Sequence, residues 1–435
     1  HTYTYTYTHV GAMPMKALDP RHPPKTGELL FDCNFECGNY GKVVYISEGE
    51  YDVFIRPDTE NTRHRLWFYF RVKNACEGQV VLFNVVNFSK TKSLYRDGMS
   101  PVVRSESRQK WERIPSKSVF YYRSPRHKMN YVMSFLFQFD QADEIYSFAY
   151  CYPYSYSDLQ RYLLALEMRQ MSFFSRDLLT RTVQGRRLDL LTIHDAEGVQ
   201  EGRRPKQKKL VVVTARVHPG ESPASFICQG LIDFLVSDDP VARALRREVV
   251  FKIIPMLNPD GVFLGNYRCS SFGFDLNRHW LVATPWSHPP IYAVKNMLVE
   301  LNEDPAYSLD FYIDIHAHST SMNGFMYCNI HDDIQKAEKE LQFLRQFDAN
   351  AKEFSLQNSR FCADPTKAGT GRRALGDYLD PTPQCFTLEV SFFGVSDGLA
   401  QRVARPFTED TYRSLGESLG RTFADNYKVK SKMQK

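Results

Sequence analysis

The sequence predicts two domains, an antiparallel β-sandwich followed by an α/β domain in which helices cover both faces of a sheet. A chain of 435 residues exceeds what one hydrophobic core usually organises, so two domains are expected. Short strands without helical periodicity occupy residues 29–152, which is typical of a sandwich. From residue 153 onward, apolar strands alternate with helical stretches, which is typical of an α/β sheet.

The first domain follows an irregular segment, residues 1–28, whose Thr-Tyr alternation we leave out of the fold prediction. Gly, Pro, Asn or charged turns bound each apolar stretch of this domain. It contains no cluster of catalytic residue types, so we expect it to bind or to act as a scaffold. The expected strands are 42–46, 51–55, 66–72, 80–87, 119–122, 131–137 and 145–150.

The second domain, residues 153–427, opens with a helix in which Leu159, Leu163 and Leu166 recur at helical spacing and which Ser157 can cap. The polar stretch 198–209 is expected to be an exposed loop, and residues 428–435 form a basic tail. The expected strands are 188–193, 210–215, 249–254, 311–315 and 386–390, and the expected helices are 222–236, 291–302, 333–354 and 409–426.

Composition places the chain among globular proteins, with 43% apolar and 24% charged residues. The net charge of +5 is too small for a nucleic-acid footprint, so nucleic acid is not expected as the primary ligand. No apolar run is long enough to cross a bilayer, and the amino end lacks the pattern of a signal peptide. We therefore expect a cytosolic protein without a membrane partner.

The nine cysteines form no disulfide framework, because their number is odd and they are scattered along the chain. This usage favours a reducing compartment. Cys33 and Cys37 are close in sequence but have no second pair to complete a metal site. We interpret them as structural thiols, with a zinc knuckle as the alternative.

A candidate metal pair ends the strand that organises the second domain, where the apolar run from Leu210 stops at His-Pro-Gly-Glu. Consecutive β-branched residues predict a strand buried on both faces, and its carboxyl end is where open α/β sheets place ligands. The spacing of His218 and Glu221 lets both side chains converge on one point, which suits Zn²⁺. On its own, the pair also fits an ordinary surface turn.

A third candidate ligand, His316, stands at the carboxyl end of the expected strand 311–315, and His318 follows on the same side. Two ligands close in sequence and a third roughly a hundred residues later is the spacing of a catalytic zinc site with an open position for water. A hydrogen-bonded core histidine is the alternative for His316. A second strand that ends at the same sheet edge with a histidine favours the metal site.

A carboxylate outside the ligand set, Glu389, lies among apolar neighbours on the expected strand 386–390, so we expect it to be partly buried. Such a group near zinc can take a proton from the bound water. The alternative is a buried glutamate that pairs with an arginine for structural reasons.

The densest polar patch, residues 258–280, contains Arg268, Asn277 and Arg278 in a stretch too irregular for a plain helix. Guanidinium groups match carboxylates in a bidentate manner, so this patch could hold an anionic group of a substrate. Asp275 is placed to accept the spare N–H of a ligand histidine and so fix its orientation. A salt-bridged loop is the alternative.

Taken together, these motifs resemble those of the zinc metallocarboxypeptidases, and specifically the cytosolic carboxypeptidase subfamily. The second domain carries HPGE at 218–221, NPDG at 258–261, DLNRHW at 275–280, DIHAHS at 314–319 and TLEVS at 387–391. FDCNFECGNYGKV at 31–43 and AYCYPYSYSDLQRY at 149–162 resemble the amino-terminal β domain of that subfamily. The resemblance implies a carboxypeptidase-like mixed sheet flanked by helices.

The resemblance also implies one zinc ion per chain, a glutamate base that later shuttles the proton, an arginine on the scissile carbonyl and its oxyanion, and a clasp for the terminal carboxylate. The matching residues are His218, Glu221 and His316 for zinc, Glu389 for the base, Arg268 for the carbonyl, and Asn277 and Arg278 for the clasp. The implied substrates are polyglutamylated tubulin and other proteins with acidic carboxyl termini, in the cytosol and on microtubule-associated structures.

The sequence departs from the resemblance where secreted relatives carry a tyrosine on a loop before the base, since residues 355–377 contain none. That stretch instead holds Lys367, Arg372 and Arg373, which could line the side-chain pocket. A cationic pocket would prefer glutamate or aspartate over lysine or arginine. The spacing to Glu389 favours Arg372 or Arg373 as the residue that reaches the substrate.

Three hypotheses follow. The first is a zinc carboxypeptidase that removes carboxyl-terminal glutamate from acidic tails, including the polyglutamate side chains of tubulin, with His318 in the pocket wall or the metal shell. The second is a zinc amidase or deacylase on acylated amino acids, and the third is an inactive module that binds acidic tails. The stretch 367–373 lacks the phosphate-binding pattern, so we expect no nucleotide cofactor.

Overall fold

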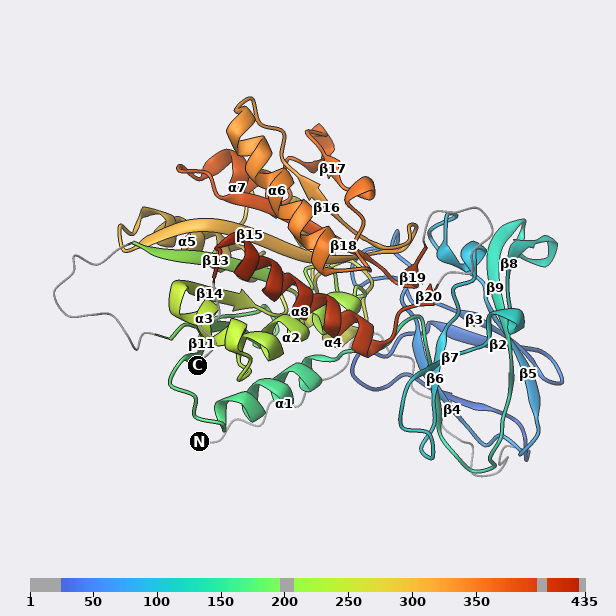
Figure 1. The fold of residues 1–435 in the computed structure, drawn as a ribbon. Helices are drawn as coiled ribbons and strands as arrows, with labels where there is room; N and C mark the ends of the chain where they lie inside the picture. The colour runs from blue at the N-terminus through green and yellow to red at the C-terminus, as the bar shows by residue number, and fades with distance from the viewer. Residues whose placement is uncertain (1–24, 196–206, 397–404, 430–435) are drawn as a thin grey trace, which may run out of the picture.

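The computed structural model describes residues 25–195, 207–396 and 405–429, and it confirms the predicted fold class. Figure 1 shows a β-sandwich beside a sheet that is layered between helices. The last strand of the sandwich ends at Ala149, and the first helix of the second domain begins at Tyr156. The predicted domain boundary at residue 152 lies between these two elements and stays a prediction. Most of the predicted loop 198–209, the tail from residue 430 and residues 1–24 lie outside the described residues.

The sandwich consists of two five-stranded sheets. The predicted antiparallel sandwich is confirmed, with one exception: β3 and β5 run parallel. The chain crosses from β3 to the other sheet through β4 before it returns to β5, and this crossover reverses the usual hairpin direction. One sheet contains β1 (Leu30–Asp32), β4 (Tyr69–Lys73), β10 (Tyr146–Ala149), β6 (Val102–Arg104) and β7 (Glu112–Arg113), and the other contains β2 (Lys42–Ser47), β3 (Glu50–Phe54), β5 (Val80–Val85), β9 (Asn130–Gln138) and β8 (Val119–Ser124).

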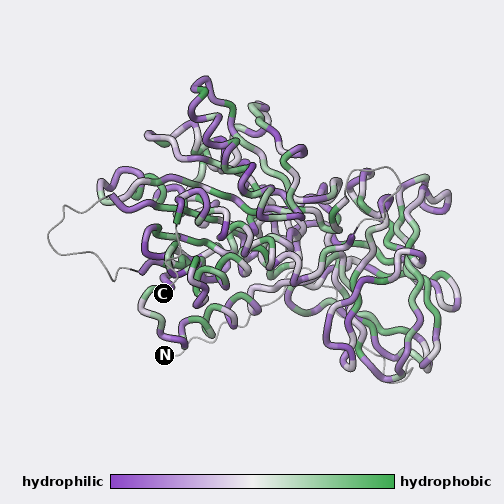
Figure 2. Tube along the Cα trace, viewed as in Figure 1, coloured by the Kyte–Doolittle hydropathy of each residue, from purple (hydrophilic) through white to green (hydrophobic). Residues whose placement is uncertain are grey.

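Aromatic rings from both sheets fill the interior of the sandwich. Phe83 lies 5.0 Å from Phe135 and 5.2 Å from Phe148, measured between ring centroids, and Phe148 lies 5.6 Å from Phe70. Alternate residues of a strand face the same side, so each strand can contribute its ring to one common core. In Figure 2 the strands of the sandwich carry much of the hydrophobic colour, and the turns at its lower end are hydrophilic.

The second domain is built on a mixed eight-stranded sheet in which β13, β14, β15 and β18 form the parallel part. Their carboxyl ends point toward the sandwich in Figure 1. The order across the sheet is β11 (Phe174–Arg181), β12 (Arg187–Ile193), β14 (Val249–Ile254), β13 (Lys208–Ala215), β15 (Tyr307–His318), β18 (Gln384–Ser391), β16 (Gly324–Cys328) and β17 (Arg360–Phe361).

Helices bury both faces of this sheet, as the consecutive valines of β13 predict. Val211 and Val213 belong to the core that includes Leu419 and Phe423 of α8, whereas Val212 packs into a second core on the opposite face. The helices on the first face include α2 (Pro223–Leu235), α3 (Pro240–Glu248), α6 (Ile334–Asn350) and α8 (Glu409–Asn426), and those on the second include α5 (Pro289–Glu303) and α7 (Gly371–Tyr378).

The structure corrects the start of the first helix, α1 (Tyr156–Glu167). Its N-cap is Ser155 and not Ser157. The Ser155 side chain accepts a hydrogen bond from the Asp158 amide, and the Asp158 carboxylate accepts one from the Ser155 amide, so a reciprocal capping box fixes the start. Ser155 is therefore the N-cap because Asp158, three residues later, can complete the capping box.

Several short elements were not predicted because their sequences are polar or brief. They include β1, β6 and β7 of the sandwich and, in the second domain, β11, β16, β17, α3, α7 and the six-residue α4 (Pro259–Leu264). The predicted helix 333–354 ends earlier, at Asn350. None of the helices in the described ranges is both long and apolar enough to cross a bilayer.

A continuous hydrophobic core joins the two domains. Tyr150 packs against Phe392 with ring centroids 5.2 Å apart, and an Arg113 nitrogen donates a hydrogen bond of 2.7 Å to the Phe392 carbonyl. The sandwich is therefore held against the carboxyl edge of the large sheet.

Glycines allow α2 and α8 to approach closely beneath the sheet. A methyl group added at Gly416 would lie 2.0 Å from the Ile227 carbonyl oxygen, and one at Gly230 would lie 2.0 Å from the Arg413 carbonyl oxygen. The backbones of the two helices are in direct contact at this crossing, so neither glycine position has room for a side chain.

We expect Gly416→Ala to destabilise the protein by about 1–3 kcal/mol, because the two helices must separate to admit the methyl group. Ser414→Ala is the matched control, since Ser414 is exposed on the same helix and should change stability by less than about 0.5 kcal/mol. Urea unfolding measures both. Equal stabilities for the two variants would contradict the close crossing.

Candidate metal centre and active site

Three side chains converge at the carboxyl ends of β13 and β15. The Glu221 carboxylate lies 2.8 Å from Nδ1 of His218 and 2.9 Å from Nδ1 of His316. The three ligand atoms lie within 4.8 Å of one another, and all three residues are buried. This is the only such group among the residues that the structure describes. The metal pair and the third ligand predicted from sequence are thus brought together.

Each histidine of this group has a second carboxylate on its other ring nitrogen. Asp275 Oδ1 lies 3.1 Å from Nε2 of His218, in the position expected for it from the sequence. Asp314 Oδ2 lies 2.8 Å from Nε2 of His316, and Thr214 donates a hydrogen bond to its other oxygen. Asp314 was not predicted from the sequence, although its place two residues before His316 puts it on the same face of β15.

These residues fit a zinc ion. Two imidazole nitrogens and one carboxylate are the usual ligands of catalytic zinc, and carboxylates on the distal nitrogens orient the rings and increase their basicity. His318 stands outside the group. Its Nδ1 accepts from the Thr320 amide at 3.2 Å, so it belongs to the wall of the cavity.

Asp275 also holds Arg268 beside the metal group. Its Oδ2 accepts a hydrogen bond of 2.7 Å from Nε of Arg268 and forms an ion pair with Nη2, also at 2.7 Å. Burial acts to raise the pKa of Asp275, but the nearby His218, Arg268 and Arg278 outweigh it and hold the pKa well below its usual range. One carboxylate therefore fixes both a ligand histidine and a guanidinium group.

The sandwich domain fixes the loop that carries Arg268. The Asp58 carboxylate accepts hydrogen bonds of 2.6, 2.7 and 2.8 Å from the amides of Tyr267, Arg268 and Cys269. Asp58 is 4% exposed, so these bonds are shielded from water. The sequence offered no signal for this role, because the partners are about 210 positions apart along the chain.

Asn277 and Arg278 lie on the irregular turn η4 (Leu276–Arg278). The Asn277 side chain accepts a hydrogen bond of 3.0 Å from the Gly371 amide, which ties the turn to the start of α7. Nη1 of Arg278 donates a hydrogen bond of 2.7 Å to the Asn277 carbonyl. The Arg278 side chain is about one-third exposed and lines the cavity. The guanidinium group thus keeps donors available for an anion.

Glu389 is half-buried and lies in register with His316 on the neighbouring strand, so both side chains face the same side of the sheet. Within the described part of the chain Glu389 forms no ion pair. This finding does not support the alternative that Glu389 pairs with an arginine for structural reasons. The carboxylate lines the same cavity as the metal group.

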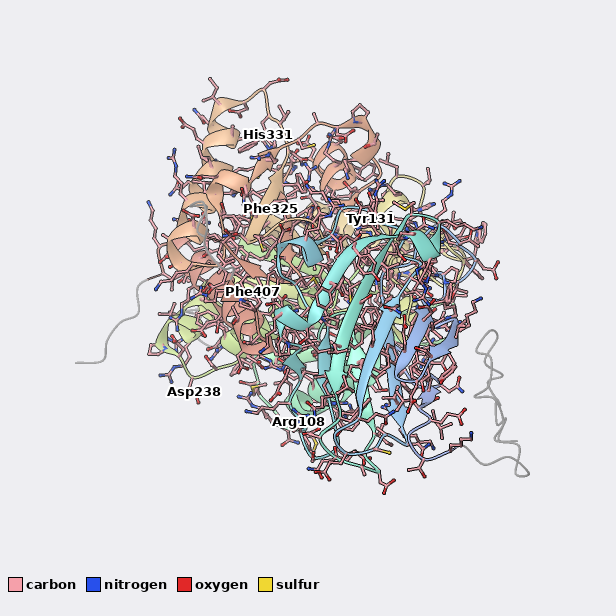
Figure 3. All side chains as sticks on the ribbon, turned by 90° about the vertical axis from the view of Figure 1, so that its right-hand side faces the viewer. Arg108, Tyr131, Asp238, Phe325, His331 and Phe407 are labelled. Atoms are coloured by element: carbon pink, nitrogen blue, oxygen red, sulfur yellow. The ribbon has the colours of Figure 1, made fainter. Side chains whose placement is uncertain are left out.

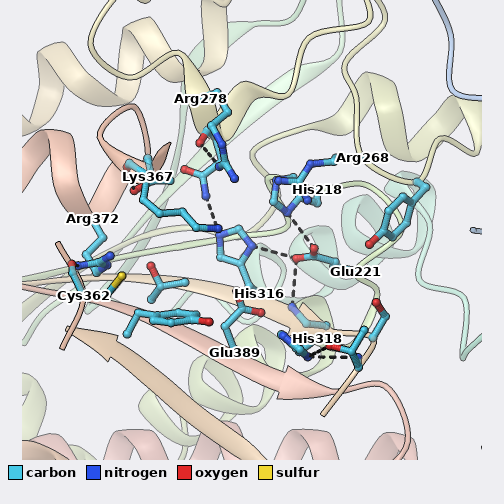
Figure 4. Close-up of a pocket in the computed structure, with 18 of the residues that line it drawn as sticks. His218, Glu221, Arg268, Arg278, His316, His318, Cys362, Lys367, Arg372 and Glu389 are labelled. Atoms are coloured by element: carbon cyan, nitrogen blue, oxygen red, sulfur yellow. Dashed lines mark hydrogen bonds and ion pairs between the residues drawn. The ribbon is translucent and has the colours of Figure 1, made fainter. Parts of the chain in front are cut away.

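The three residues of the metal group share one cavity of about 240 Å³ with Arg268, Asn277, Arg278 and Glu389. Figure 4 shows Arg278, Lys367 and Arg372 on one side of the metal group and His318 on the other. Arg372 is 3% exposed and donates to the Cys328 carbonyl at 2.7 Å. Arg373 is not among the residues of the cavity lining, and it faces Asp377 at 3.6 Å.

The cavity also contains residues that were not predicted from the sequence. Tyr267 and Tyr327 line it, and neither lies in the stretch 355–377, where secreted relatives carry a tyrosine. Lys90 reaches it from the sandwich domain. Its Nζ donates to the Tyr267 hydroxyl at 2.6 Å and to the Ser319 hydroxyl at 2.9 Å.

Comparison with known proteins agrees with this arrangement. Residues 159–378 match the zinc carboxypeptidase family, and residues 31–150 match the cytosolic carboxypeptidase N-terminal domain. Cytosolic carboxypeptidase 6 from Mus musculus is 55% identical over 412 residues, which cover 95% of this chain and 76% of that protein. Its counterpart from Caenorhabditis elegans is 46% identical, with 93% of this chain and 89% of that protein covered.

Solved structures show the same fold. A metallo-carboxypeptidase from Burkholderia cenocepacia superposes with a TM-score of 0.78 at 25% identity, over 92% of this chain and 99% of that one. The fold and the site define an enzyme of the zinc carboxypeptidase class, which uses one zinc ion. Within this class, the chain belongs to the cytosolic carboxypeptidase family.

We expect zinc to stabilise the protein, by about 3 kcal/mol once free zinc exceeds the Kd by roughly a hundredfold. His316→Ala should lose both the bound zinc and this stabilisation. Elemental analysis and thermal melting with added zinc measure the two effects. His318→Ala is the control from the same strand and should keep one zinc per chain; a comparable loss in both variants would contradict the ligand assignment.

Proposed function

We propose that this enzyme removes carboxyl-terminal glutamate from acidic protein tails. The observation that carries the proposal is the arrangement of one cavity: a metal group in the middle, a clasp for a carboxylate on one side, and further cations beside that clasp. An exopeptidase needs this combination, because a fixed distance from clasp to metal selects the last peptide bond.

In this proposal Asn277 and Arg278 bind the terminal carboxylate of the substrate. The guanidinium group of Arg278 supplies donors in the geometry that carboxylates accept. Arg268 is aimed by Asp275 toward the metal group, and it would hold the scissile carbonyl oxygen as negative charge develops there.

Lys367 and Arg372 would receive the side chain of the last residue. Both line the cavity on the side of Arg278. A glutamate side chain would pair with these cations, whereas a lysine or arginine side chain would be repelled. Arg373 has no part in this pocket because it lies outside the lining.

When bound, zinc lowers the pKa of a water molecule and polarises the carbonyl. The residues that would hold it are His218, Glu221 and His316. Glu389 acts as the general base: its carboxylate takes the proton from the attacking water and later gives it to the leaving amino group. His316 and His218 keep their orientation through Asp314 and Asp275.

The proposed substrates include the polyglutamate side chains of tubulin and other proteins with acidic carboxyl termini, and the proposed location is the cytosol, including microtubule-associated structures. Two observations support the cytosolic location: relatives are named cytosolic carboxypeptidases, and all nine cysteines are free thiols. Free thiols persist in reducing compartments.

Glu389→Gln should lower kcat on a polyglutamate-ended peptide by about 10²- to 10⁴-fold, because it removes the proton acceptor. Mass spectrometry of the peptide follows the stepwise loss of glutamate. Glu353→Gln is the control, since Glu353 pairs with Arg405 outside the cavity.

Retained turnover in folded, zinc-loaded Glu389→Gln would refute the base assignment. A preference for single acylated amino acids over peptides would support an amidase instead, and tight peptide binding by wild-type protein without zinc or turnover would support a binding module.

A further inference from the structure

A row of cations leads from the active-site cavity onto the surface of the sandwich domain. It begins at Lys90 in the cavity and continues through Lys92 and Arg96 to Arg123 on β8. Lys90 is half-buried and the other three are exposed. We call these four residues the basic row.

Aromatic rings support the basic row. Tyr121 and Tyr131 stack with ring centroids 5.0 Å apart and an interplanar angle of 4°. The guanidinium group of Arg96 lies 4.7 Å from the Tyr131 ring, and that of Arg123 lies 5.1 Å from the same ring. The Tyr121 hydroxyl donates to the Lys90 carbonyl at 3.3 Å, so the stack is joined directly to the segment that enters the cavity.

These cations lack acidic partners. Within the described part of the chain, no carboxylate forms an ion pair with any member of the basic row. Two other arginines of the sandwich do have acidic partners: Arg126 lies 2.9 Å from Glu50, and Arg108 lies 2.8 Å from Asp140. The charges of the basic row are therefore available to a ligand.

The direction of a bound substrate places this row upstream of the scissile bond. Arg278, Lys367 and Arg372 lie on one side of the metal group and His318 on the other (Figure 4). If the last residue of the substrate occupies the first side, the preceding residues leave past His318. Ser319, the next residue, is bonded to Lys90.

We propose that the basic row is an extended binding site for the carboxylates of an acidic tail upstream of the bond that is cleaved. Lys90 meets the carboxylate nearest the scissile bond, and Arg96 and Arg123 meet more distant ones. This inference rests on the proposed function, and it adds a specific site on the sandwich domain.

An acidic peptide fits the row better than a nucleic acid does. Single-stranded nucleic acids need aromatic faces on which bases stack. Here Tyr131 is already stacked on Tyr121 and covered by two guanidinium groups. The row also starts inside a cavity whose other end holds cations suited to a carboxylate.

The test compares two peptide substrates in the zinc-loaded enzyme. One is a decaglutamate, and the other ends in two glutamates but has only uncharged residues upstream. For Arg96→Gln/Arg123→Gln, kcat/KM should fall roughly fivefold on the first, mainly through KM, and change less than about twofold on the second. Added salt should weaken the first reaction more than the second, and this excess salt dependence should be smaller in the variant.

Arg108→Gln/Lys110→Gln is the charge-matched control. Figure 3 places Tyr131 at the upper end of the sandwich and Arg108 at the opposite end. This control should treat both peptides as wild-type enzyme does. Lys90→Gln should lower kcat/KM only when glutamate stands directly upstream of the scissile bond, and Lys90→Arg should restore it.

Binding of labelled decaglutamate to zinc-loaded Glu389→Gln protein, followed by fluorescence anisotropy, tests the basic row in the absence of turnover. Weaker binding when Arg96 and Arg123 are also replaced supports the row. Unchanged binding, equal losses on both peptides, or stronger competition by an RNA oligonucleotide than by unlabelled decaglutamate would overturn it. Failure of wild-type enzyme to release glutamate would instead refute the proposed function.

Discussion

The parallel pairing of β13, β15 and β18 is the constraint on which the rest of the structure depends. Because these strands run in the same direction, their carboxyl ends meet at one edge, and the residues that end them must share that edge. His218 and Glu221 follow β13, His316 lies two residues before the end of β15, and Glu389 lies beside His316 on β18. Burial of both sheet faces under helices makes this edge rigid, which a metal site requires.

The sandwich domain is part of this site and not only a neighbour. The Asp58 carboxylate accepts hydrogen bonds from three backbone amides of the loop that carries Arg268, and Lys90 extends into the cavity. Losing Asp58 would leave those amides unpaired, at about 1–3 kcal/mol for each group. The hydrophobic contact of Tyr150 with Phe392 holds the domains together, so loop and cavity keep a fixed relation.

The sequence predicted what depends on local pattern. His218, Glu221 and His316 could be found because each follows an apolar strand, and Asp275 because it lies in the polar patch beside Asn277. Asp58 and Lys90 could not, since one aspartate and one lysine in a β-rich segment carry no periodic signal, and only tertiary packing brings them to the site. The parallel β3–β5 pair could not be predicted for the same reason. The relative direction of β3 and β5 depends on the position of β4 in the other sheet, and only the tertiary structure shows that position.

The central claim is that the clasp selects a free terminal carboxylate at a fixed distance from the metal. The direct test measures kcat/KM of the wild-type enzyme and of Arg278→Met on two peptides that differ only in a free or an amidated terminal carboxylate. The account predicts that amidation lowers kcat/KM of the wild-type enzyme at least about a hundredfold, since it removes a charged pairing worth roughly 3 kcal/mol or more, and that Arg278→Met largely abolishes this difference. Equal cleavage of both peptides by the wild-type enzyme would contradict it.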